Sequence, residues 1–192
     1  LFDEIKWKHK ENYLEILKSY KKIPNISVKI NKLNYNEEDF LDLLDMKKIN
    51  ILKKVEDVYY IDSGVILETH EFKRGQITVQ DGSSFLAAKY LDPQPGERIL
   101  DTCSAPGGKS MAMAEMMENE GEIVALDIHE HKLKLIESRT KQMGIDIVHP
   151  ELMDARLVDA EFGAESFDRV LVDAPCSGFG VIRKKPEVLY TK

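Results

Sequence analysis

Ile99–Ser110 reads ILDTCSAPGGKS, and these twelve residues indicate the fold of the larger part of the 192-residue chain. A short apolar run ends on Asp101, a Pro-Gly-Gly turn follows, and a segment rich in Ala and Met then begins a helix. Glycine in such a turn lets backbone N–H groups and a helix N-terminus approach a bound nucleotide closely. The stretch therefore predicts a strand–loop–helix unit that can hold a nucleotide-like cofactor.

The acid after the next apolar run supports this interpretation. Glu122–Leu126 is followed by Asp127, which lies 19 positions after Gly108. In dinucleotide-binding folds, an acid about 20 residues beyond the glycines binds the ribose hydroxyls. A plain strand–helix turn remains the simpler alternative. A phosphate-binding P-loop is excluded, because it needs glycine at the position that Cys103 occupies.

Strands and helices alternate through residues 80–173. We expect helices at Ser83–Leu91, Lys109–Glu118, Glu130–Met143 and residues 155–162, and strands at Arg98–Asp101, Glu122–Leu126, Ile145–Val148 and Phe167–Asp173. Acids stand at the ends of three of these strands, at positions 101, 127 and 173. Four such repeats predict an α/β fold with a doubly wound parallel sheet that binds ligands at the carboxyl ends of its strands.

A different pattern precedes residue 72. We expect a helix at Tyr13–Tyr20, strands near Ile26–Ile30, Ile49–Val55, Val58–Ile61 and Val65–Leu67, and a helix capped by Asn36. The alternation of Ile26, Val28 and Ile30 predicts a strand with one buried face. Residues 1–72 are therefore predicted to form a small α+β domain of the RRM or ferredoxin type, and residues 73–192 the α/β domain. We find no aromatic cluster of the RNA-binding kind, which favours a packing role over stacking on bases.

The composition narrows the class of protein. Hydrophobic residues make up 43% of the chain, yet no apolar run approaches the roughly 18 residues that would cross a bilayer. A net charge of −7 argues against a protein that coats nucleic acid by bulk charge. Cys103 and Cys176 lie in separate motifs, so a reduced, cytoplasmic setting is expected. His129 and His131 would face different sides of a helix, so no metal site is expected.

The second motif, LVDAPCSGFG at residues 171–180, places a cysteine where a strand ends. Cys176 follows a proline and lies near Asp173, and the thiolate fraction of a free cysteine is strongly nucleophilic. A basic triplet comes next: Arg183, Lys184 and Lys185. These side chains would favour the thiolate if the loop folds back, or hold a phosphate backbone, and a solvated charge run is the alternative.

Together these motifs resemble the RNA cytosine-C5 methyltransferase family, most closely the bacterial RsmB/Sun type that modifies 16S ribosomal RNA. The matching segments are QDGSS at 80–84, LDTCSAPGGKS at 100–110, Asp127, Asp154 and DAPCSGFGVIRKKPEV at 173–188. SVKIN at 27–31 resembles the start of the family's small N-terminal RNA-binding domain, where Arg is usual at the position of Lys29.

The resemblance implies a Rossmann-like methyltransferase sheet that binds S-adenosylmethionine. It assigns the cofactor to one loop, which consists of Cys103, Ser104, Ala105, Pro106, Gly107, Gly108 and Lys109. It also assigns the ribose hydroxyls to Asp127, the adenine amino group to Asp154, and a place near the reacting centre to Asp173. Three of these residues also have a purely structural alternative. Asp154 could equally cap a helix, Cys103 could be a small residue packed in the core, and Lys109 could be a surface residue at the start of a helix.

The resemblance also implies a mechanism. In the family, a thiolate adds to C6 of cytosine, C5 then takes the methyl group, and Asp173 would stabilise protonation at N3. The attacking thiol belongs to a second Cys motif, and Cys176 would assist breakdown of the adduct, although DNA cytosine methyltransferases use a Pro-Cys cysteine as nucleophile. Such chemistry requires a base free of its stack.

Because the chain stops at Lys192, before that second motif, we expect a fragment without full activity that carries the family's first four strands in the order 3-2-1-4. The predicted function is S-adenosylmethionine-dependent methylation of cytosine C5 in 16S-type ribosomal RNA, with RNA as the partner and neither membrane nor metal involved. One alternative is a non-catalytic RNA-binding or assembly fragment, which would bind RNA but no cofactor. Another is a methyltransferase that acts on transfer RNA.

Overall fold

The computed structural model describes residues 6–20 and 25–176. The chain divides into two compact units, one of residues 1–25 with 175–192 and one of residues 26–174. In the first unit, helix α2 (Tyr13–Tyr20) forms where the sequence predicts it. The basic triplet at 183–185 lies outside the described residues.

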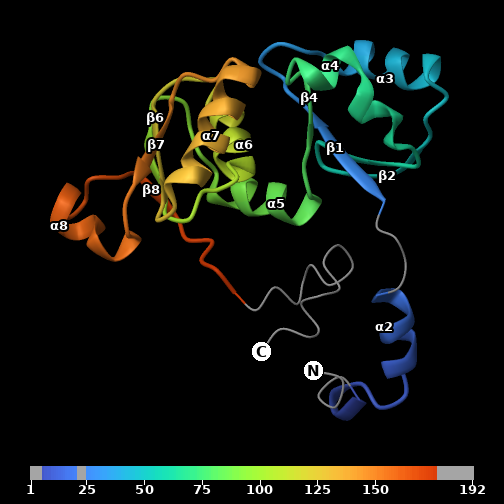
Figure 1. The fold of residues 1–192 in the computed structure, drawn as a ribbon, viewed down its shortest axis with the longest axis horizontal. Helices are drawn as coiled ribbons and strands as arrows, with labels where there is room; N and C mark the ends of the chain where they lie inside the picture. Colours follow the sequence, from blue (N-terminus) through green and yellow to red (C-terminus); the bar gives the residue numbers. More distant parts are fainter. Residues whose placement is uncertain (1–5, 21–24, 177–192) are drawn as a thin grey trace. The chain divides into compact units, whose positions relative to one another are not determined.

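A four-stranded antiparallel sheet begins the second unit (Figure 1). Its strands are β1 (Ile26–Ile30), β2 (Ile51–Val55), β3 (Val58–Ile61) and β4 (Ile77–Val79), arranged in the order β2-β3-β1-β4. Helices α3 (Glu37–Met46) and α4 (His70–Lys73) lie on one face, over an apolar core that includes Val28 and Phe40. As expected, Asn36 caps α3, and its side chain accepts a hydrogen bond from the Asp39 N–H at 2.8 Å. The likeness of this sheet to an RRM stays a prediction.

Two expectations for this sheet are wrong. Residues 65–67 are not a strand but part of a 3-10 helix, η1 (Gly64–Glu68), because the Ser63 side chain accepts a hydrogen bond from the Val65 N–H and starts a helical turn. The fourth strand of the sheet is instead β4, which lies after residue 72, where the sequence predicts that the chain divides into two domains. Strand β1 is also buried on both faces, since Ser27 and Lys29 are each only 3% exposed.

The second face of β1 is buried because helix α5 (Gly82–Leu91) covers this side of the sheet. Val58 shares a hydrophobic core with Phe85, and the Tyr60 hydroxyl accepts a hydrogen bond from the Gly82 N–H at 3.2 Å. The Lys29 ammonium lies 5.9 Å from the Phe85 ring centroid. This face of the sheet therefore packs against the rest of the unit, which agrees with a packing role.

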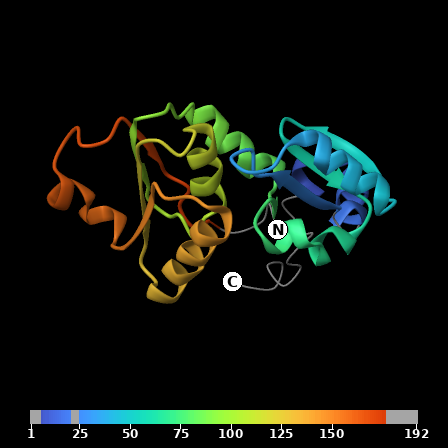
Figure 2. The same ribbon diagram turned by 90° about the horizontal axis from the view of Figure 1, so that it is seen from above.

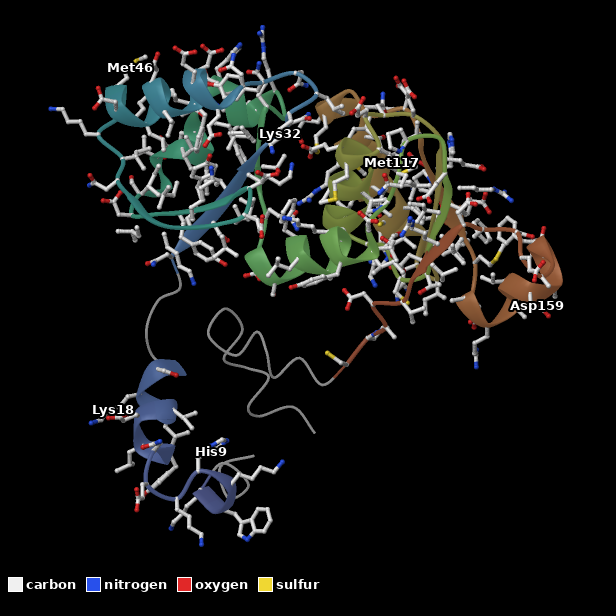
Figure 3. All side chains as sticks on the ribbon, turned by 180° about the vertical axis from the view of Figure 1, so that it is seen from behind. His9, Lys18, Lys32, Met46, Met117 and Asp159 are labelled. Carbon is white, nitrogen blue, oxygen red and sulfur yellow. The ribbon has the colours of Figure 1, made fainter. Side chains whose placement is uncertain are left out.

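A parallel sheet forms the larger part of the unit. Its strands are β5 (Arg98–Asp101), β6 (Glu122–Asp127), β7 (Val148–Leu152) and β8 (Arg169–Leu171), and the order β7-β6-β5-β8 confirms the predicted 3-2-1-4 arrangement. Figure 2 shows α6 (Gly108–Met116) and α7 (Glu130–Met143) on one side of this sheet, and η2 (Ala155–Leu157) leads into α8 (Val158–Phe162) on the other. Met113 and Met117 fill the core between α6 and the sheet (Figure 3).

Helix α7 has the predicted bounds, and Gly144 ends it in a left-handed conformation with φ +69°. Strand β7 begins later than predicted, at Val148 instead of Ile145. Ile145 and Ile147 are buried as the alternation suggests, but they lead into the strand. The segment of β7 that pairs with β6 contains Pro150. A proline, which has no backbone N–H, is tolerated in an outer strand because one edge of that strand donates no hydrogen bond to a neighbouring strand. Among the described residues, no helix is long and apolar enough to cross a membrane.

Candidate functional site

A cavity of about 260 Å³ lies at the carboxyl end of β5. Its wall comes from β4 and the turn after it, from the loop after β5, and from α5, α6 and α7. The lining residues are Val79, Gln80, Asp81, Ser84, Asp101, Cys103, Ser104, Ala105, Pro106, Gly108, Lys109, Arg139 and Asp173. The structure therefore brings six of the seven predicted loop residues, all except Gly107, to one cavity together with Asp173.

The loop keeps its shape through glycine and through bonds to β6. Gly107 precedes α6 with φ +92°, a left-handed conformation that strains any residue with a Cβ atom. The Ser104 N–H and hydroxyl both donate to the Leu126 carbonyl, at 2.8 and 3.0 Å. A Cβ atom at Gly108 would lie 3.3 Å from Gln80 Oε1, so the backbone approaches its neighbour closely there. The result is a fixed turn that presents the N-terminus of α6 beside the cavity.

Asp101 is the most deeply buried acid of the cavity wall. It is 1% exposed, and its Oδ2 accepts a hydrogen bond from the Ser110 hydroxyl at 2.7 Å. Its Oδ1 has no hydrogen-bond partner within the described part of the chain. Burial raises the pKa of Asp101 to about 6, while the Ser110 hydroxyl acts in the opposite direction. A ligand that donates a hydrogen bond would satisfy this carboxylate.

Asp173 and Lys109 form an ion pair at the mouth of the cavity. The Asp173 side chain is 54% exposed, whereas that of Lys109 is 20% exposed. Lys109 is therefore more than a surface residue at the start of α6, because its ammonium holds the carboxylate of Asp173 in place. An exposed, oriented carboxylate can accept or hold a proton on a bound substrate.

Asp127 and Asp154 lie at the ends of the neighbouring strands, and neither lines the cavity. Asp127 ends β6, where its Oδ1 accepts a hydrogen bond from the His129 N–H at 2.9 Å. Asp154 follows β7 and caps η2, as the structural alternative predicts, by accepting from the Arg156 N–H at 3.0 Å. The Arg156 guanidinium also pairs with this carboxylate and lowers the pKa of Asp154 to about 2.

The two cysteines have different surroundings. Cys103 is half-buried in the cavity wall, and Cys176 is exposed in the unit that contains residues 175–192. No group of three or more His, Cys, Asp or Glu side chains in the described residues could hold a metal ion.

Five polar residues of the cavity wall have no role that the sequence alone predicts. Gln80, Asp81 and Ser84 belong to the QDGSS segment, so the matching motif was the available indication, although it gave them no role. Arg139 gave no indication, because it is one of many charged residues in α7. Asp101 was read only as the end of a strand, and Ser110, which received no role, holds its carboxylate.

The chain is similar in sequence to known proteins. The family model described as 16S rRNA methyltransferase RsmB/F matches residues 88–192. The chain is 45% identical, over 88% of its length, to the probable ribosomal RNA small subunit methyltransferase B of Bacillus subtilis. It spans less than half the length of the curated relatives it matches, 38% of that protein and 45% of a relative from Yersinia pseudotuberculosis.

Solved structures agree in fold over nearly the whole chain. The crystal structure of PH0851 matches with a TM-score of 0.91 and 34% sequence identity. The matched region covers 99% of this chain and 44% of the PH0851 chain. The structure of a methyltransferase homolog protein from Pyrococcus horikoshii matches with a TM-score of 0.80 and 30% sequence identity. The matched region covers 94% of this chain and 60% of the homolog.

Proposed function

We propose that the chain binds S-adenosylmethionine as the methyl donor for cytosine C5 methylation in 16S ribosomal RNA, because it belongs to the 16S rRNA methyltransferase RsmB/F family. The observation that carries this proposal is the cavity itself. A glycine turn that cannot hold larger residues without strain lies near the buried carboxylate of Asp101, which has one oxygen that no described residue satisfies. Such a site fits a ligand that carries both a nucleoside and a hydrogen-bond donor.

The positions of the acids suggest how an extended cofactor would lie. Neighbouring strands are about 4.8 Å apart, so the ends of β5, β6 and β7 form a ledge of roughly 10 Å. In this proposal Asp127 binds the ribose hydroxyls and Asp154 the adenine amino group along that ledge. The cavity, at about 260 Å³, is smaller than the ~300–1,000 Å³ of sites that enclose a whole drug-sized ligand, so it would receive only the other end.

When bound, the cofactor supplies an electrophilic methyl group. The exposed carboxylate of Asp173 would hold a proton at N3 of the target cytosine, oriented by its ion pair with Lys109. Cys176 would assist breakdown of the covalent adduct on the base, for which an exposed thiol is suited.

The target base would have to leave its stack to reach Asp173. One face of the N-terminal sheet is packed against α5, which argues against base stacking there. We therefore assign the phosphate backbone to Arg183, Lys184 and Lys185. We further propose that residues 1–72 form an RNA-binding-type module, that residues 73–192 form the methyltransferase module, and that the protein acts in the cytoplasm.

Calorimetry with S-adenosylhomocysteine tests the cofactor assignment. The chain should bind this product, and Asp127→Asn should weaken binding by about tenfold, because a charge-assisted hydrogen bond to the ribose is lost. Asp159→Asn is the matched control, since Asp159 lies on α8 and belongs to no part of the site (Figure 3). A chain that gives no heat, yet binds RNA, would be a non-catalytic RNA-binding fragment.

The RNA class needs its own measurement. Fluorescence anisotropy should show tighter binding to an unmodified fragment of 16S ribosomal RNA than to unmodified transfer RNA at equal salt concentration, because affinities at different salt cannot be compared. A preference for transfer RNA would leave the methyl donor in place and replace the proposed substrate.

A further inference from the structure

Arg139 is a cation of the cavity wall that pairs with no other side chain in the described part of the protein. It lies on α7, is partly buried, and makes no hydrogen bond or ion pair with any residue in the described ranges 6–20 and 25–176. Its guanidinium lies near the turn, since Nη1 is 3.9 Å from the place of a Cβ atom at Gly108. Burial lowers the pKa of Arg139, but a guanidinium stays protonated in proteins. A partly desolvated charge without a partner has an unused capacity to bind an anion.

The surroundings of Arg139 increase this capacity. The N-terminus of α6, a helix of nine residues, begins at Gly108 and contributes a further partial positive charge. The exposed acid of the cavity, Asp173, already pairs with Lys109. An incoming anion would therefore find donors in both the guanidinium and the first N–H groups of the helix.

A buried carboxylate oxygen in the same cavity specifies the kind of ligand. Asp101 is 1% exposed, and its Oδ1 accepts no hydrogen bond from the described residues. Within residues 6–20 and 25–176, this cavity thus contains a guanidinium and a carboxylate oxygen that are both without a partner. The matching ligand is a zwitterion whose ammonium and carboxylate groups are close together, as in an α-amino acid.

We propose that Arg139 binds the α-carboxylate of the methionine end of S-adenosylmethionine, while Asp101 accepts a hydrogen bond from the ammonium group on the same carbon. This assignment rests on the proposed function and adds a residue to it. It also accounts for the position of the cavity beside β5, away from Asp127 and Asp154, because the amino-acid end is opposite to the adenine in the extended cofactor.

An RNA phosphate is the competing anion, and the charges of the cavity disfavour it. A phosphodiester brings a negative charge alone, and three carboxylates, Asp81, Asp101 and Asp173, belong to the same wall. An amino-acid end brings its own ammonium and satisfies both kinds of group at once.

Two ligands that differ only at the amino-acid end test the assignment. S-adenosylhomocysteine has the zwitterion, and 5′-methylthioadenosine lacks it while keeping the nucleoside and the thioether. In calorimetry, Arg139→Gln should weaken S-adenosylhomocysteine binding on the order of tenfold to a hundredfold and change 5′-methylthioadenosine binding less than twofold. Arg139→Lys, which keeps the charge but loses the planar donor pair, should restore part of the affinity. Lys141→Gln removes a charge from the exposed side of the same helix and should leave both affinities unchanged.

Each result is decisive. Equal weakening of both ligands, or no weakening of either, overturns the assignment of Arg139 while leaving the proposed function intact. Loss of RNA binding by Arg139→Gln with unchanged S-adenosylhomocysteine affinity assigns the residue to a phosphate and also overturns it. If the unmodified chain binds neither ligand, the proposed function fails and this inference with it. Binding of 5′-methylthioadenosine by each variant shows that its site is folded.

Discussion

Asp101→Asn should stabilise the chain at neutral pH while it weakens cofactor binding. Burial raises the pKa of Asp101 from 3.8 to about 6, and one carboxylate oxygen has no partner among the described residues. The folded chain therefore holds this proton to a higher pH than the unfolded chain does. The stability contributed by the protonated group is fully present below pH 3.8 and is lost as the pH rises through about 6.

The size of the effect follows from the two pKa values. A difference of about 2 pKa units corresponds to about 3 kcal/mol, at 1.36 kcal/mol per unit. Asparagine has nearly the same shape and carries no charge at any pH, so it avoids this loss, and its oxygen can still accept from Ser110. The free energy of unfolding of the variant, minus that of the unmodified chain, should rise by about 2 kcal/mol between pH 4 and pH 8, because the unfolded acid is already more than half ionised at pH 4.

Urea denaturation followed by circular dichroism at several pH values measures this difference. Asp159→Asn on α8 is the control, and its difference from the unmodified chain should hardly change with pH. Ser110→Ala should move the pKa of Asp101 still higher, because it removes the hydrogen bond that stabilises the ionised form. An Asp101→Asn difference that is constant from pH 4 to pH 8 would show that the pKa of Asp101 is not raised, since a buried acid with a raised pKa must produce a slope.

The unmodified chain should bind S-adenosylhomocysteine about tenfold more tightly at pH 7 than at pH 5, because Asp101 must ionise to accept from the ammonium group; a flat profile in calorimetry would contradict this. Lys29→Met should cost about 3–5 kcal/mol in urea denaturation, because it leaves the buried carboxylate of Glu115 unpaired, and the double variant Lys29→Met/Glu115→Leu should recover most of this loss. Equal stabilities of the single and double variants would show that the pair is not coupled. Gly107→Ala should destabilise the chain by about 1–2 kcal/mol through its positive φ, whereas Gly108→Ala, which has no positive φ, should cost less; equal losses would remove backbone strain as the cause.

Much of the parallel sheet could be predicted from local patterns. The strands at Arg98–Asp101 and Glu122–Asp127 follow from apolar runs that end in an acid, and α7 follows from its periodicity and from Gly144. These features depend on neighbours within a few residues, and a parallel sheet with both faces covered needs continuous apolar strands. The order of the strands follows from the family resemblance, and the sheet confirms it.

Local patterns failed where a distant partner decides the outcome. Lys29 has the position of a polar residue on an amphipathic strand, yet α5 covers it, and Glu115, 86 positions later, pairs with its buried charge. The segment at 65–67 has the composition of a strand, but the Ser63 cap and the burial of Ile66 favour a 3-10 helix there.

From local patterns it follows that a glycine turn comes after a buried strand, that acids end the neighbouring strands, and that a cysteine motif follows the fourth strand. Which of these residues share a cavity depends on the folded chain, which joins Asp173 to Lys109 and leaves Asp127 and Asp154 outside. Folding also places Arg139 in the wall and leaves one oxygen of Asp101 without a partner among the described residues. The physical reason is that burial, charge pairing and pKa depend on groups that folding brings together from distant parts of the chain.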